Sequence, residues 1–143
     1  MGRLANPILH HLAITVTDLD ASMVWYQEIF DVSLLLETPH EGGTGMVLAD
    51  EQRTLAIVLH RHDANEGEEF SERRTGLDHA GLMVTSRAEL ERWQDHLAAH
   101  GVVPSAKAAS PLTQSPIADE PYGSVLVFRD PDNIQLEIFS PPA

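Results

Sequence analysis

The chain has 143 residues, of which 43% are hydrophobic, and this suits one globular domain with its own core. Its formal net charge of -13 argues against a nucleic-acid partner, because a phosphate backbone needs a surface rich in Lys and Arg. Cysteine is absent, so disulfides and thiolate metal sites are excluded, and any metal ion must bind through nitrogen and oxygen. No apolar stretch is long enough for a membrane span, and the first residues lack the apolar run of a secretory signal. We therefore expect a cytoplasmic protein without a membrane partner.

The first half of the chain predicts a strand, a helix and three further strands. Residues 9–16 alternate between two kinds of side chain in the manner of a strand, and Thr17 or Asp18 can cap a following helix. Residues 32–36, 46–49 and 55–60 have the composition of strands. The intervening sequences PHEGGTG and DEQR have turn chemistry.

The second half repeats this order. Residues 77–84 predict a strand, Ser86 and Glu89 form a capping box at the start of a helix, and Gly101 is placed to end that helix. Residues 102 and 103 begin another strand, and residues 125–128 and 134–139 predict a final hairpin around RDPDN. Residues 109–122, with three prolines, predict a long loop that borders a pocket.

An internal repeat connects the two halves. The sequence HLAITVTDLDASMVW from His11 resembles HAGLMVTSRAELERW from His79, with one offset throughout, 79 − 11 = 68. His, Val, Thr and Trp recur in register, and both segments have the same pattern of strand, cap and helix. We therefore predict a single domain, 1–143, with one βαβββ module at 8–60, a polar linker at 61–76 and a second βαβββ module at 77–140.

Alternation along the predicted strands sorts their side chains into two faces. One face is aliphatic and suits a covering helix. The other carries small, polar or ionisable residues, among them His11, His79 and Glu137. Because this second face has few of the Lys, Glu and Thr residues of a solvated sheet, we interpret it as the lining of a cup.

With these features the sequence resembles the vicinal-oxygen-chelate superfamily, which includes glyoxalase I, extradiol dioxygenases, fosfomycin-resistance enzymes and bleomycin-binding proteins. The motifs that carry the resemblance are HHLAITVTDLDAS, GLDHAGLMV and DPDNIQLEIF, between about residues 8 and 139. It implies an α+β fold in which two βαβββ modules form an open, U-shaped mixed sheet, or cup, with helices on the outer face. It also implies homodimers whose sites draw strands from both subunits.

The same resemblance implies that His11, His79 and Glu137 bind a divalent metal ion. Two imidazoles and a carboxylate leave coordination positions open for a substrate, whereas a site closed by four protein ligands is structural. Fe²⁺ is the favoured ion, and Mn²⁺, Zn²⁺ and Ni²⁺ are alternatives. The other histidines lack the support of the repeat and stay unassigned as ligands; apart from His60, they are His10, His40, His62, His96 and His100.

One position departs from the glyoxalase pattern. The fourth protein ligand of that branch, normally Glu, corresponds here to Val58, whose aliphatic side chain neither binds a metal nor abstracts a proton. Val58 is therefore a candidate only for the lining of the cup. His60 shares its face and is a candidate general acid or base, although a histidine at the rim is an equally good interpretation. Tyr122 could donate a hydrogen bond to a substrate or simply pack beside Gly123.

Three functions follow as hypotheses. The leading one is a metal-dependent, dioxygenase-like enzyme that acts on a small oxygenated organic substrate; isomerase, lyase or transferase chemistry on the same metal stays open. The alternative is a protein that binds and sequesters a small-molecule antibiotic, as bleomycin-resistance proteins do. Glyoxalase I-type lyase activity is disfavoured by Val58.

Overall fold

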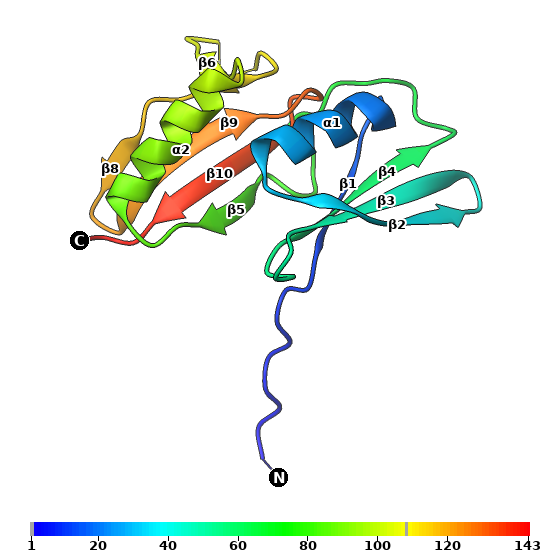
Figure 1. The fold of residues 1–143 in the computed structure, drawn as a ribbon, viewed down its shortest axis with the longest axis horizontal. Coiled ribbons are helices and arrows are strands. Elements are labelled where there is room, and N and C mark those ends of the chain that lie inside the picture. The colour runs from blue at the N-terminus through cyan, green and yellow to red at the C-terminus, as the bar shows by residue number, and fades with distance from the viewer. Residues whose placement is uncertain (1, 108) are drawn as a thin grey trace.

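The computed structural model describes residues 2–107 and 109–143 (Figure 1). It confirms the expected α+β class. The first half contains a strand, a helix and three strands: β1 (Leu12–Thr15), α1 (Leu19–Ile29), β2 (Ser33–His40), β3 (Gly43–Ala49) and β4 (Ala56–His62). The second half contains β5 (Ala80–Met83), α2 (Arg87–Ala99), β6 (Val103–Pro104), β7 (Thr113–Gln114), β8 (Ala118–Glu120), β9 (Gly123–Arg129) and β10 (Gln135–Ser140).

Each half builds its own open, mixed sheet. The first has the order β1-β4-β3-β2, in which β1 lies parallel to β4 and the other neighbours are antiparallel. The second has the order β5-β10-β9-β7-β6, with β8 also paired to β9, and here β5 lies parallel to β10. The parallel pairs are equivalent, because each joins the first and last strands of its half.

Both helices begin where their sequences predict. The side chain of Asp18 accepts a hydrogen bond from the Ala21 amide at the start of α1, and the side chain of Ser86 accepts one from the Glu89 amide at the start of α2. These carboxylate and hydroxyl oxygens satisfy amides that have no partner within the helix. Gly101 follows α2 with φ of 80°, a left-handed conformation that glycine adopts without steric cost.

The hydrophobic core lies between the sheets and the helices of both halves. Leu136 and Ile138 of β10 enter this core, as do Ile57 and Leu59 of β4. Their neighbours in sequence point to the opposite face of each sheet, so the predicted aliphatic faces are confirmed for these strands. Helix packing joins the halves directly, since the ring of Phe30 lies 5.6 Å from that of Trp93.

The structure corrects two details of the predicted elements. The stretch 109–122, expected to be a loop, contains the short strands β7 and β8 and extends the second sheet. In the first half β2 and β3 are longer than predicted, so the turn between them is reduced to Glu41 and Gly42. Gly42 there adopts φ of 80°. Among the described residues, no helix combines the length and apolar composition needed to cross a bilayer.

Candidate metal site

The second sheet brings two of the three predicted ligands together. His79 immediately precedes β5, and Glu137 lies on β10 opposite Gly81. The Nε2 atom of His79 lies 3.2 Å from the Oε2 atom of Glu137. Both side chains are partly exposed on the face of the sheet that the core does not cover. The pair is therefore open to a ligand.

The other ring nitrogen of His79 has a separate partner. Nδ1 lies 2.7 Å from Oδ1 of Asp78 and can donate a hydrogen bond to it. This hydrogen bond is the main cause that raises the pKa of His79; the negative charge of Glu137 adds to the effect and partial burial opposes it. When Nδ1 carries the proton, a neutral ring leaves the lone pair of Nε2 directed toward the side of Glu137.

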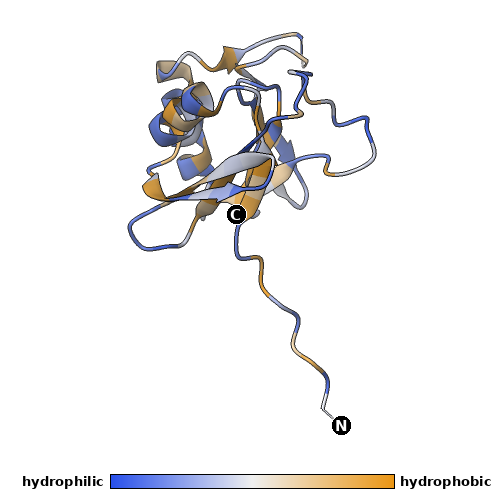
Figure 2. Ribbon diagram, turned by 90° about the vertical axis from the view of Figure 1, so that its right-hand side faces the viewer, coloured by the Kyte–Doolittle hydropathy of each residue, from blue (hydrophilic) through white to orange (hydrophobic). Residues whose placement is uncertain are grey.

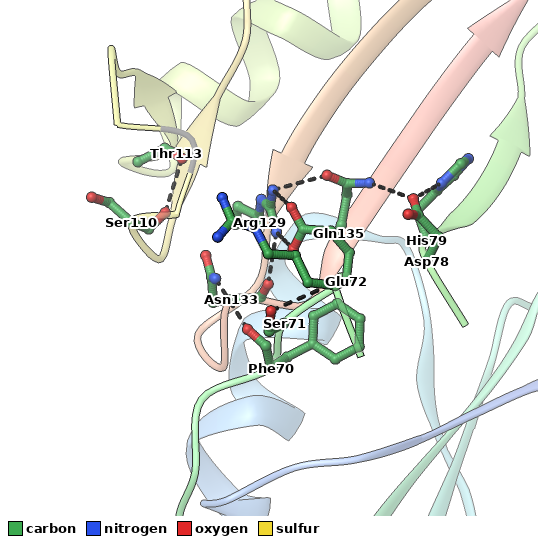
Figure 3. Close-up of polar contacts among 11 residues, drawn as sticks. Phe70, Ser71, Glu72, Asp78, His79, Ser110, Thr113, Arg129, Asn133 and Gln135 are labelled. Atoms are coloured by element: carbon green, nitrogen blue, oxygen red, sulfur yellow. Dashed lines mark hydrogen bonds and ion pairs between the residues drawn. The ribbon is translucent and has the colours of Figure 1, made fainter. Parts of the chain in front are cut away.

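A chain of hydrogen bonds connects Asp78 to Gln135, Arg129 and Glu72 (Figure 3). Gln135 donates a hydrogen bond from Nε2 to Asp78 Oδ1 at 3.0 Å and accepts one from Arg129 at 2.8 Å. Arg129, only 4% exposed, makes two hydrogen bonds to the carboxylate of Glu72 at 3.1 and 3.0 Å. The guanidinium lowers the pKa of Glu72 to about 2. The orientation of the His79 ring is thus coupled to a buried charged group.

The geometry of this pair fits a shared divalent ion. Two ligand atoms that each lie about 2.0–2.2 Å from one ion stand roughly 3.0–3.5 Å apart, and 3.2 Å falls within that range. Gly81 lies next to Glu137, since a Cβ atom there would lie 3.4 Å from Glu137 Oε2, at ordinary van der Waals distance. Imidazole nitrogen and carboxylate oxygen are also a donor set that several divalent ions accept.

His11 does not join this pair within one chain. It directly precedes β1 of the first sheet, where its Nδ1 atom lies 2.9 Å from that of His10. Across residues 2–107 and 109–143, no three His, Cys, Asp or Glu side chains converge on a point that could hold an ion. The single chain therefore presents a pair of candidate ligands on one sheet and the third candidate on the other.

Strand register gives Val58 a structural equivalent. Val58 pairs with Ala13 on β1, two residues after His11, and Glu137 pairs with Gly81 on β5, two residues after His79. Val58 therefore occupies in the first half the position that Glu137 occupies in the second. It is 8% exposed and lies outside the main core cluster. The first half accordingly has an apolar side chain where the second has a carboxylate.

His60 lies among histidines that the sequence left unassigned. Its ring centroid is 5.3 Å from that of His40 and 5.9 Å from that of His62. Partial burial lowers the pKa of His60, and the nearby imidazoles of His40, His62 and His11 lower it further. Alternation along the strand could have grouped His60 with His62. The position of His40 could not be read from the sequence, because it depends on the β2–β3 register.

Tyr122 lies before β9 and is 65% exposed. Its ring stacks on that of Phe139, with centroids 6.5 Å apart and planes inclined by 10°. Phe139 follows Glu137 on the same face of β10, so Tyr122 extends an aromatic surface beside the ligand pair. The structure thus shows packing of the ring beside β9, while its hydroxyl stays a candidate contact for a substrate.

Comparison with known proteins identifies the family. The sequence model of the Glyoxalase/Bleomycin resistance protein/Dioxygenase superfamily matches residues 8–138. The chain belongs to this superfamily. That membership confirms the family resemblance seen in the sequence motifs. No curated protein matches the chain significantly.

Solved structures of superfamily proteins share the fold. A glyoxylase/bleomycin resistance protein/dioxygenase domain from Frankia sp. EAN1pec is 32% identical, with a TM-score of 0.82 over 96% of this chain and 94% of that one. A glyoxalase family protein from Enterococcus faecalis is 19% identical, with a TM-score of 0.71 over 92% and 96% of the two chains. The genomically encoded fosfomycin resistance protein FosX from Listeria monocytogenes, complexed with Mn(II) and sulfate ion, is 18% identical, with a TM-score of 0.62 over 96% and 95%.

Proposed function

We propose that this protein is a metal-dependent enzyme of the superfamily that acts on a small oxygenated organic substrate. The observation that carries the proposal is the His79–Glu137 pair, with 3.2 Å between the ligand atoms. The pair lies on an open sheet face, and the hydrogen bond to Asp78 orients the imidazole. The FosX complex with Mn(II) supports a divalent ion as the cofactor, although it shares only the fold. Fe²⁺ is our first choice because two His and one carboxylate form the triad of ferrous oxygenases.

The third ligand is proposed to be His11 of the partner subunit in a homodimer. His11 and the His79–Glu137 pair lie on different sheets of one chain, so a second copy is the simplest source of the missing imidazole. Exposed apolar side chains lie in the segments next to His11 and His79. Leu77, two residues before His79, is 68% exposed, and Met83, at the end of β5, is 69% exposed. In the segment before His11, Leu4, Ile8 and Leu9 are exposed. Figure 2 shows this N-terminal segment extending away from the rest of the chain. A partner that buried these side chains would gain hydrophobic free energy while completing the site.

The residues of the chain divide the work as follows. His79, Glu137 and His11 would hold the ion, which when bound would supply Lewis-acid polarisation of substrate oxygen. Asp78 fixes the proton on His79 Nδ1, and the Gln135–Arg129–Glu72 network keeps Asp78 in place. Val58 and Phe139 supply apolar lining. His60 is the candidate to accept or return a substrate proton, because its lowered pKa leaves the ring neutral near pH 7. Oxygenative ring cleavage is the leading reaction.

A second candidate function is the binding and sequestration of a small aromatic molecule such as an antibiotic. The observation that favours it is the stacked, exposed pair Tyr122–Phe139, which could extend over a flat ligand. In that case the ligand pair would contact the bound molecule directly and need no ion. Affinity for an aromatic ligand that is the same with and without metal would support this function.

Metal analysis of protein purified without chelators distinguishes a metal-dependent enzyme from a protein that sequesters a small molecule without metal. We expect about one tightly bound Fe²⁺ or Mn²⁺ ion per chain, whose binding is lost in His79→Ala and kept in His100→Ala, a change at an exposed histidine at the C-terminal end of α2. Gel filtration and ultracentrifugation of the same samples test the dimer. Binding of Fe²⁺ or Mn²⁺ that persists unchanged in both His79→Ala and Glu137→Gln would overturn the proposed metal site.

A further inference from the structure

Three histidines gather on the open face of the first sheet. His40 ends β2, and His60 and His62 lie two residues apart on β4. Between these strands, β3 presents Gly43 opposite both His40 and His62, and Gly45 opposite His60. These glycines leave the rings their space. A Cβ atom at Gly43 would lie 2.8 Å from Cε1 of His40, and one at Gly45 would lie 2.8 Å from Cε1 of His60.

Two of the imidazoles already stand at the spacing of metal ligands. His60 Nδ1 and His40 Nε2 lie 3.3 Å apart. Two nitrogens bound at about 2.0–2.1 Å to one tetrahedral ion are separated by roughly 3.3–3.4 Å. Without an ion, the same separation lets one neutral ring donate a hydrogen bond to the other. No residue of opposite charge is needed to hold the two rings together.

The third imidazole is close enough to complete a set. The ring centroid of His62 lies 5.3 Å from that of His40 and 5.9 Å from that of His60. Rings whose nitrogens point at one tetrahedral ion have centroids roughly 5–6 Å apart, given the same bond lengths. In the arrangement described here the three side chains do not converge on one point. His62 is exposed, so rotation of its side chain to bring a nitrogen inward breaks no core packing.

We propose that His40, His60 and His62 form a second metal site, made only of imidazoles, that takes Zn²⁺, Ni²⁺ or Cu²⁺. Its chemistry differs from that of the His79–Glu137 pair. Imidazole suits these ions, whereas a site with a carboxylate also accepts Mn²⁺, which has the weakest affinity of the series for nitrogen ligands. Three protein ligands leave a fourth position for water or for a ligand atom. The inference rests on this cluster alone and does not require the proposed enzyme activity. A His60 nitrogen bound to this ion cannot accept a substrate proton, so metal binding here and the proton transfer proposed for His60 are alternatives.

Zinc titration of the protein, followed by calorimetry and by NMR of the histidine ring nitrogens, tests this site. The double variant His40→Gln/His62→Gln should weaken one class of Zn²⁺ site by about 100-fold or more, while His100→Ala leaves it unchanged. In the His79→Ala background one Zn²⁺ per chain should still bind and should shift the His40, His60 and His62 resonances together. Calorimetry of the same variant should show no comparable binding of Mn²⁺.

Two results would overturn the inference. One is an unchanged zinc stoichiometry and affinity in His40→Gln/His62→Gln with native circular dichroism. The other is a Zn²⁺ ion that shifts His10 and His11 and leaves the cluster unaffected. Loss of Mn²⁺ binding in Glu137→Gln, with zinc still bound at the cluster, would leave both sites separately established. Mn²⁺ binding therefore tests the His79–Glu137 site and Zn²⁺ binding tests the histidine cluster, so that either proposal can fail independently of the other.

Discussion

The two halves of the chain have one plan and different chemistry. In each half a histidine immediately precedes the first strand. The residue two positions after that histidine pairs with a residue of the last strand. That residue of the last strand is Glu137 in the second half and Val58 in the first. The next position on the same face is Phe139 in the second half and His60 in the first. The duplicated scaffold thus places a carboxylate–imidazole pair on one sheet and imidazoles beside an apolar side chain on the other.

The difference shows where the two halves depend on each other. His79 and Glu137 can hold an ion only with further ligands, and His11 cannot hold one tightly alone. Only the second half has a buried arginine behind its candidate ligands among the described residues. Arg129 on β9 donates hydrogen bonds to Gln135, which contacts Asp78, and to Glu72 in the connecting segment. A comparable buried cation is absent from the described strands of the first half. The asymmetry predicts that changes in the second half affect both folding and metal binding.

The largest effect is expected for Arg129→Met. The substitution leaves the carboxylate of Glu72, the carbonyl of Asn133 and the amide of Gln135 without the donor that now satisfies them. Because Arg129 is buried, we expect a loss of about 3 kcal/mol in the free energy of unfolding, measured by urea denaturation. Arg92→Met on α2 is the control, and an equally small loss in both variants would contradict the supporting role.

Next in size is the effect of Glu137→Gln on metal binding. The amide keeps the shape of the side chain and removes the charge, so the affinity for Mn²⁺ measured by calorimetry should fall by about 100-fold. Glu120→Gln, an exposed carboxylate on β8, is the matched control.

Val58→Glu makes the comparison sharper, because it gives the first half the missing carboxylate. We expect the metal ion to dissociate more slowly from this variant than from the wild-type protein. Faster dissociation would contradict the equivalence of positions 58 and 137.

Contacts between the halves make stability depend on pH. Asp130, which precedes β10, accepts hydrogen bonds from Tyr26 on α1 and from the amides of Asp132 and Ile134. Burial raises the pKa of Asp130 to about 6 in spite of these hydrogen bonds. The folded state therefore binds a proton that the unfolded state, with its ordinary pKa near 4, has already released. This contribution to stability is present below about pH 4 and is lost as the pH rises to about 6.

We expect this loss to amount to about 2 kcal/mol between pH 4 and pH 7. The measurement is the difference in unfolding free energy between wild type and Asp130→Asn across that range, which cancels the other titrating groups. Asp119, whose pKa is lowered to about 2 by Arg87, has the opposite sign and acts only at lower pH. A difference that stays constant from pH 4 to 7 would show that Asp130 is already ionised in the folded protein.

Much of the geometry of the candidate site was predictable from the sequence, because it follows from local rules. The repeat identified His11 and His79 as equivalent, and the two-residue period of a strand placed Glu137 opposite to Leu136 and Ile138. The cap residues Asp18 and Ser86 were also readable, because capping depends on neighbours three residues away.

What the sequence did not reveal depends on tertiary register. The cluster of His40 with His60 requires a two-residue turn at Glu41 and Gly42, which pairs His40 with Gly43. Glu72 lies in a segment interpreted as a polar linker, and its partner Arg129 is 57 residues away. No periodic pattern encodes such a pair. The pairing of β7 and β8 with β9 was missed because three prolines favour an irregular segment.

The smallest expected effect separates orientation from coordination at His79. Asp78→Asn keeps the size of the side chain but replaces a charged acceptor by a neutral one, so the His79 ring is held less firmly. Metal affinity should fall by about tenfold, the lower end for groups that orient a ligand. The pKa of His79, followed by NMR in metal-free protein, should fall toward its ordinary value, because the hydrogen bond to Asp78 is the main cause of its rise. Asp95→Asn, on the outer helix α2, should change neither quantity. A lower affinity with an unchanged pKa would contradict this role, because loss of either the Nδ1 hydrogen bond or the negative charge of Asp78 should lower the pKa of His79.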